Sequence, residues 1–184
     1  LAYWLKNRDF TWEVEHDARP MYAPTQSWSW GGQPLRDYQE SAAEFLTRWK
    51  WGIVHAPPRA GKTRILGAAL YQLQVAPAVV ICGRVALASQ TRAALQELLP
   101  NADIGLFGGG KCRTGDLTVG TWQSIHQAFK QKVTVKDTAA VALTETEQHN
   151  LADLWERAAI VCVDECRGIV SPSMQKIMRR AVAT

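Results

Sequence analysis

The chain has 184 residues, of which 47% are hydrophobic and 21% charged, and its formal net charge is +4. This composition lets it bury a core and suits one soluble domain with an appendage. The small positive charge permits nucleic-acid binding without demanding it, because no long basic run is present. No apolar stretch approaches the ~20 residues of a membrane span and the N-terminus lacks a signal-peptide core, so we expect a cytoplasmic protein without a membrane segment.

Residues 1–33 are predicted to form an irregular appended segment, or the tail of an upstream domain, because Pro20, Pro24 and the pair Gly31-Gly32 interrupt any regular pattern. Four tryptophans lie in this segment: Trp4, Trp12, Trp28 and Trp30. Such side chains can stack on nucleic-acid bases. We favour instead an anchoring role on the domain surface, because aromatic side chains bury a large area.

A regular pattern begins at Pro34, and its first apolar residues fall on one helical face: Leu35, Tyr38, Ala42, Phe45, Leu46 and Trp49. Strands and helices then alternate. We expect strands at 52–55, 78–82, near 104, at 117–119 and at 160–163, and helices at 62–74 and 86–99. This alternation predicts an α/β fold with a mostly parallel central sheet flanked by helices.

The apolar run that ends at Val54 leads into a phosphate-loop pattern, [AG]-x-x-x-x-G-K-[ST], and a helix is predicted to follow. Backbone N–H groups of such a loop can cradle phosphates at a helix N-terminus. Lys62 would reach the β- and γ-phosphates, and the Thr63 hydroxyl would bind Mg²⁺. The loop residues expected at the nucleotide are Ala56, Pro57, Pro58, Arg59, Ala60, Gly61, Lys62 and Thr63.

A second apolar run, 160–163, ends in the carboxylate pair Asp164-Glu165. At the tip of a strand, Asp164 would hold the same Mg²⁺ through water, and Glu165 would orient and deprotonate the attacking water. Either motif alone can arise by composition. Both together, in this order and each at the end of an apolar run, indicate an ATPase that uses Lys62, Asp164 and Glu165 as its catalytic residues.

The cysteines and histidines give no metal-site signal. The cysteines, which form no C-x-x-C pair, are Cys82, Cys112, Cys162 and Cys166. We favour reduced core thiols over a zinc site or disulfides. The histidines are scattered singly and are interpreted as structural or surface residues: His16, His55, His126 and His149.

Residues 131–158 break the alternation and are predicted to be an insertion. Thr144 and Glu147 have the spacing of a capping box, which would open a helix through Leu151, Leu154 and Trp155.

The order of these elements resembles the first RecA-like motor domain of superfamily 2 helicases, in particular the DExH-type DNA helicases of phages and their repair and restriction relatives. The resemblance covers 34–184. The segment Leu35-Arg36-Asp37-Tyr38-Gln39 is similar to the adenine-recognition motif, which implies that Gln39 hydrogen-bonds adenine and that Arg36 belongs to the nucleotide site. An exposed glutamine at the start of a helix is the alternative. Ala56 stands where many phosphate loops have Gly, a substitution that the family often shows.

Three further segments resemble the nucleic-acid contacts of this family. Residues 80–90 are similar to motif Ia, although Gly83 and Arg84 stand where Pro and Thr are usual, and residues 108–111 and 119–124 resemble a glycine loop and motif Ib. Simple turns and a surface arginine are the alternatives. The resemblance implies phosphate contacts at Arg84, Gly109, Lys111 and Thr121.

Together these motifs predict the ATP-binding N-terminal motor domain of a DNA helicase or translocase, with ATP and Mg²⁺ as cofactors, and with DNA and a second RecA-like domain as partners. Motif III and that second domain, which carries the family's arginine finger, are expected beyond 184. Arg167 stands where the family's box, D-E-x-H or D-E-x-D, has His or Asp. This departure puts in doubt the coupling of the nucleotide site to nucleic acid and to the second domain. The alternatives are a non-catalytic nucleotide-dependent module, an RNA helicase, and a P-loop NTPase unrelated to nucleic acid.

Overall fold

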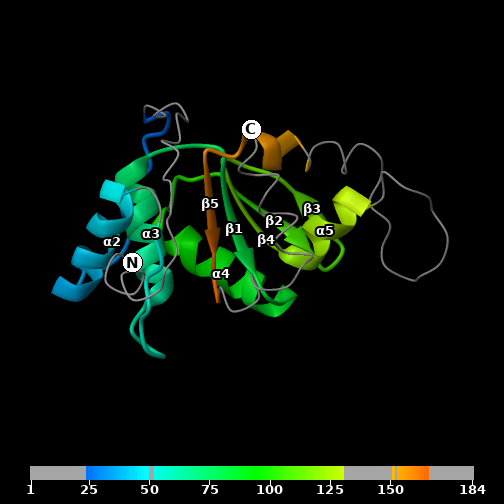
Figure 1. Ribbon diagram of the computed structural model, residues 1–184. Coiled ribbons are helices and arrows are strands. Elements are labelled where there is room, and N and C mark those ends of the chain that lie inside the picture. The colour runs from blue at the N-terminus through cyan, green and yellow to red at the C-terminus, as the bar shows by residue number, and fades with distance from the viewer. Residues whose placement is uncertain (1–23, 50–51, 131–150, 152, 166–184) are drawn as a thin grey trace, which may run out of the picture.

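The computed structural model describes residues 24–49, 52–130, 151 and 153–165, which form a sheet between two layers of helices (Figure 1). Strand order is β3-β2-β4-β1-β5, and β3 alone among these five is antiparallel to its neighbour. The strands are β1 (Ala78–Cys82), β2 (Ile104–Gly108), β3 (Lys111–Arg113), β4 (Leu117–Thr121) and β5 (Ile160–Val163). The expected α/β fold with a mostly parallel sheet is therefore confirmed.

The helices named in Figure 1 are α2 (Asp37–Trp49), α3 (Lys62–Leu73), α4 (Val85–Leu98) and α5 (Trp122–Lys130). Residues 151 and 153–157 are also helical. Within the described ranges, no helix combines the length and apolar character that crossing a bilayer requires.

Alternate residues of β1 face opposite layers, which shows how a continuous apolar run forms a central strand. Val80 and Cys82 pack with α3 and α4 residues in one cluster, whereas Val79 and Ile81 pack in a second cluster. That second cluster also holds the fully buried Trp155. The residues around 155 thus complete the core on the face opposite α4. Thr144 and Glu147 lie outside the described residues.

The apolar face predicted for α2 is only partly covered. Leu35 and Leu46 pack against α3, but Tyr38, Phe45 and Trp49 are 46%, 44% and 55% exposed. α3 therefore buries one part of the face and leaves the other part exposed.

The strand expected at 52–55 is also wrong, because residues 52–57 are neither strand nor helix. Ile53 is 67% exposed. An apolar run becomes a strand only when a neighbouring strand pairs with its backbone, and none of the described strands lies beside this one. The phosphate loop is therefore approached by an extended segment outside the sheet.

The N-terminal residues from Thr25 onward are strapped across the ends of α3 and α4. The Gln74 side chain accepts from the Trp28 amide at 2.6 Å and donates to the Trp28 carbonyl at 2.9 Å. Trp28 is 5% exposed and joins the core cluster of α4, and the Trp30 ring lies 5.8 Å from that of Tyr71. Anchoring is confirmed for these two tryptophans, while Trp4 and Trp12 lie outside the described residues.

Candidate nucleotide and nucleic-acid site

The parallel strands bring most predicted site residues to one edge of the sheet. β1, β2, β4 and β5 all end there, because parallel strands share one carboxyl edge. Gly83 and Arg84 follow β1, Gly109 follows β2, Thr121 ends β4 and Asp164 follows β5. In open α/β sheets this edge is where ligands bind.

The phosphate loop turns sharply into α3. Arg59 and Gly61 both have left-handed backbones, with φ of 65° and 78°. A left-handed backbone favours glycine at 61, where a Cβ would also lie 2.6 Å from Gln39 Nε2 and displace that side chain. Lys62 is exposed and Thr63 half-buried. The loop therefore presents backbone and both predicted phosphate-end side chains at a helix N-terminus, a suitable place for an anion.

The segment that resembles the adenine-recognition motif contacts the phosphate loop directly. Gln39, only 4% exposed, donates from Nε2 to the Ala60 carbonyl at 2.9 Å. The Tyr38 hydroxyl donates to the same carbonyl at 3.0 Å. The alternative of an exposed glutamine at a helix start is thus wrong. Tyr38 was not among the predicted site residues, although it lay inside the quoted motif.

A cavity of about 500 Å³ opens between these two elements. Arg36 and Tyr38 border it from the start of α2, and the loop residues from Val54 to Ala60 border it from the other side. Its largely apolar lining, with the guanidinium groups of Arg36 and Arg59 and the Tyr38 phenol, suits a planar heterocycle. Lys62 and Thr63 are not in its wall.

The carboxylate pair is fixed by β5. The Asp164 amide donates to the Ile81 carbonyl at 2.8 Å, which ties the pair to the end of β1. Glu165 is exposed and has a φ of 56°. Burial raises the pKa of the Cys82 thiol, and the negative charges of Asp164 and Glu165 add to this rise. Both carboxylates therefore stand beside the carboxyl end of β1.

The structure does not join the loop to the carboxylates. Among the described residues, no hydrogen bond or ion pair connects Lys62 or Thr63 with Asp164 or Glu165. Arg167 lies outside the described residues.

The remaining predicted contacts gather at the ends of β1, β2 and β4. The Thr121 hydroxyl lies 2.9 Å from that of Ser124, and both would touch a Cβ at Gly108, at 3.2 and 3.1 Å. Gln123 Nε2 donates to the Gly83 carbonyl at 3.1 Å and so links the turn before α4 to the start of α5. The side chains of Arg84 and Lys111 are exposed beside this cluster. Gln123 was not predicted, because nothing in its local sequence indicates a contact forty residues away.

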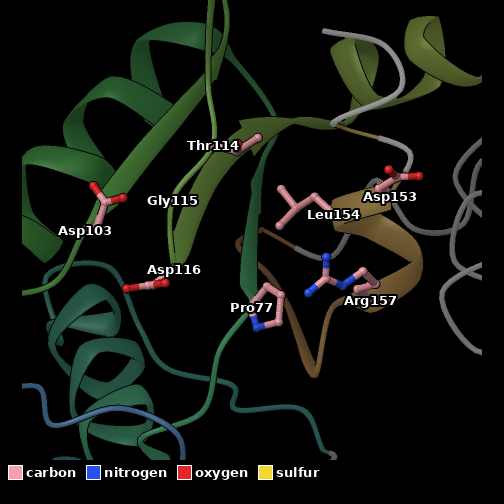
Figure 2. A pocket seen from close by; sticks show the side chains of 8 residues that line it. All are labelled: Pro77, Asp103, Thr114, Gly115, Asp116, Asp153, Leu154 and Arg157. Atoms are coloured by element: carbon pink, nitrogen blue, oxygen red, sulfur yellow. The ribbon is translucent and has the colours of Figure 1, made fainter. Parts of the chain in front are cut away.

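A second cavity, of about 400 Å³, lies at the opposite edge, where the parallel strands begin (Figure 2). Figure 2 shows Asp103 and Asp116 on one side of it and Leu154 and Arg157 on the other. Asp153 adds a third carboxylate to its wall. These carboxylates would repel phosphates, so this cavity is not the nucleotide site. No group of three potential metal ligands occurs in the described parts of the chain.

A parallel sheet with a glycine-pinned phosphate loop and carboxylates at its carboxyl edge defines the RecA-like ATPase domain of superfamily 2 helicases and translocases. The comparisons agree with this class. The family described as "Type III restriction enzyme, res subunit" (ResIII) matches residues 33–183, and the chain belongs to this family.

The similar proteins are longer than this chain, which covers only part of each. A curated relative, the DNA 3'-5' helicase XPB of Mycobacterium tuberculosis, is 29% identical over 124 residues, which cover 66% of the chain but 22% of that protein. Among solved structures, the UvsW helicase from bacteriophage T4 matches with a TM-score of 0.58 and 16% identity, over 86% of this chain and 51% of that one. The Sulfolobus solfataricus SWI2/SNF2 ATPase core in complex with dsDNA matches with a TM-score of 0.50 and 14% identity, over 86% and 38%. These structural matches confirm the fold.

Proposed function

We propose that this domain binds Mg·ATP between its phosphate loop and the start of α2, as the motor domain of a DNA helicase or translocase. The observation that carries the proposal is the pair of hydrogen bonds from Tyr38 and Gln39 to Ala60. They join the segment that would read the base to the loop that would hold the phosphates, on the border of a cavity large enough for a base.

Gln39 keeps hydrogen-bonding capacity for adenine. A side-chain amide has two N–H donors and an oxygen that accepts twice. One donor is used by Ala60, and the oxygen accepts from the Arg36 amide at 3.1 Å. The second donor meets the Tyr38 hydroxyl only at 3.5 Å, where little hydrogen bonding is left. One donor and one acceptor thus suit the amino group and ring nitrogen of adenine, with Arg36 placed to stack on the base.

The phosphate end would be held by the loop amides and by Lys62. Mg²⁺ fits the residues present, since the Thr63 hydroxyl and the Asp164 carboxylate are the hard oxygen ligands that this ion prefers. When bound, the ion neutralises charge on the phosphates. Glu165, exposed at the strand tip, would accept the proton of the attacking water.

DNA would run along the strand ends that carry Arg84, Gly109, Lys111 and Thr121. Two exposed cations and an exposed glycine turn are suited to phosphate oxygens, which carry no sequence information, whereas the Thr121 side chain is buried behind them. DNA is favoured over RNA because the sequence relative is a DNA helicase.

Salt titration of single-stranded DNA binding tests this role. If each cation neutralises one phosphate, log K should fall with log salt, and Arg84→Ala and Lys111→Ala should each flatten the slope by about 0.7. Fluorescence anisotropy from 50 to 200 mM salt measures it, with Arg157→Ala at the opposite edge as the control. Binding that ignores salt, or that responds equally to all three variants, contradicts this surface.

A further inference from the structure

Arg64 directly follows the two predicted phosphate-end residues, yet its side chain turns back toward the chain before α2. Its Nη2 donates to the carbonyls of Gln33 and, at 3.1 Å, Pro34. Its backbone amide meanwhile donates to the Gly61 carbonyl at 2.9 Å within the first turn of α3. One residue thus connects the phosphate-loop helix to the approach of α2.

The Arg64 side chain is half-buried. Its Nε is covered and has no hydrogen-bond partner in the described part of the chain, while Nη2 reaches its two carbonyls at the surface. The covered Nε together with the two carbonyl contacts favours one orientation of the side chain. Hydrogen bonds from a charged donor are about twice as strong as neutral ones. The contact is therefore suited to fix a chain segment.

The same segment is held at its other end as well. Gln39 and Tyr38 bond to Ala60, which lies four residues before Arg64. The stretch 33–39 is thus tied at both ends to the short stretch 60–64. Arg36 lies midway and borders the cavity. The Arg64 contacts at 33–34 fix its position relative to the loop together with the packing of Leu35 against α3.

We propose that Arg64 is a positioning residue for nucleobase selection: it braces residues 33–34 so that Arg36 and Gln39 meet the base, without itself contacting the nucleotide. The proposal rests on the nucleotide site proposed above. It predicts that losing the guanidinium weakens recognition of the base and spares recognition of the phosphates.

The test compares dissociation constants of Mg·ATP, Mg·GTP and inorganic tripolyphosphate, measured by calorimetry on the 184-residue chain. Arg64→Met keeps most of the aliphatic stem, Arg64→Lys keeps one charged donor, and Arg157→Met is the matched control. For Arg64→Met we expect the ATP constant to rise about tenfold, the scale of one lost charged hydrogen bond. The tripolyphosphate constant should change less than about twofold, the preference for ATP over GTP should shrink, and Arg64→Lys should recover part of both.

Equal weakening of ATP and tripolyphosphate would overturn the proposal, because it would mean a phosphate contact or a folding defect. Unchanged ATP affinity would overturn it too. Amide hydrogen exchange without nucleotide gives an independent readout, since the Gln39 and Glu40 amides both donate to Arg36. They should exchange faster in Arg64→Met, and unchanged exchange refutes the brace itself. A wild-type chain that binds neither ligand refutes the nucleotide site and base selection with it, while the exchange data still decide whether the brace exists.

Discussion

Three non-glycine residues of the described chain have left-handed backbones, and each lies at a turn with several contacts or predicted roles. Arg59 is in the phosphate loop, Glu165 follows β5, and Gln74 ends α3. Such conformations cost of order 1–3 kcal/mol and persist only where surrounding structure imposes them. Gln74 shows the imposing contacts directly, through both of its bonds to Trp28. At Arg59 and Glu165 the strain coincides with the two loops proposed for the chemistry.

The half-buried thiol of Cys162 on β5 gives the residue-scale prediction. Burial raises the pKa of Cys162 from 9.0 to about 12. A raised pKa in the folded state means that the fold favours the protonated thiol. The contribution of this thiol to the free energy of unfolding is therefore complete below pH 9 and is lost as the pH rises toward 12. The free energy of unfolding, from urea titrations at pH 8 to 11, should fall more steeply in wild type than in Cys162→Ala. Parallel curves would contradict the assignment.

At the scale of elements, composition predicted the central strands well because burial on both faces leaves a plain apolar run, as at 78–82 and 117–121. The sequence pattern failed where pairing with another segment decides whether a strand forms. The shorter run at 52–55 has no paired neighbour among the described strands, and the three-residue strand β3 carries too little pattern to detect. The same holds for the candidate site. Its motifs could be read from local sequence, whereas the hydrogen bonds of Gln123, Arg64 and Gln74 reach residues far away in the chain and could not.

The N-terminal residues that cross the ends of α3 and α4, held by the hydrogen bonds between Trp28 and Gln74, allow a prediction about stability. Gln74→Ala removes two side-chain hydrogen bonds to Trp28 and keeps the backbone strain, so we expect a loss of about 1–3 kcal/mol in stability. For a chain of this size that lowers the melting temperature by roughly 2–10 °C. The Trp28 amide should also exchange faster. Gln90→Ala, on the exposed surface of α4, is the control. A melting temperature unchanged in both variants would show that these hydrogen bonds contribute nothing to stability.

For the whole molecule, the proposed nucleotide site draws on two places in the fold. The loop and α2 form one, and the carboxylates at the end of β5 form the other. The chain spans about half, or less, of each of the similar proteins. From the resemblance to superfamily 2 helicases we propose that a second RecA-like domain supplies an arginine to the transferred phosphoryl group, a contribution of about 10³ to 10⁵ in rate in such enzymes.

This expectation predicts slow turnover by the 184-residue chain alone. Steady-state ATP hydrolysis with single-stranded DNA should be at least about 10³-fold faster in a polypeptide that continues through the second domain. Glu165→Gln should abolish the fast rate. If the chain alone is equally fast and Glu165→Gln stops it, the arginine is internal and the two-domain mechanism is wrong. If Glu165→Gln changes neither rate, the non-catalytic binding module becomes the better description.

The central claim, a Mg·ATP site built on the phosphate loop, is tested most directly by calorimetry of Mg·ATP with wild type and Lys62→Ala. Lys62 is exposed at the start of α3, so its replacement removes a phosphate contact without opening the core. We predict measurable binding by wild type that strengthens with Mg²⁺, and none by Lys62→Ala. Equal affinity of the two proteins for ATP would contradict the account.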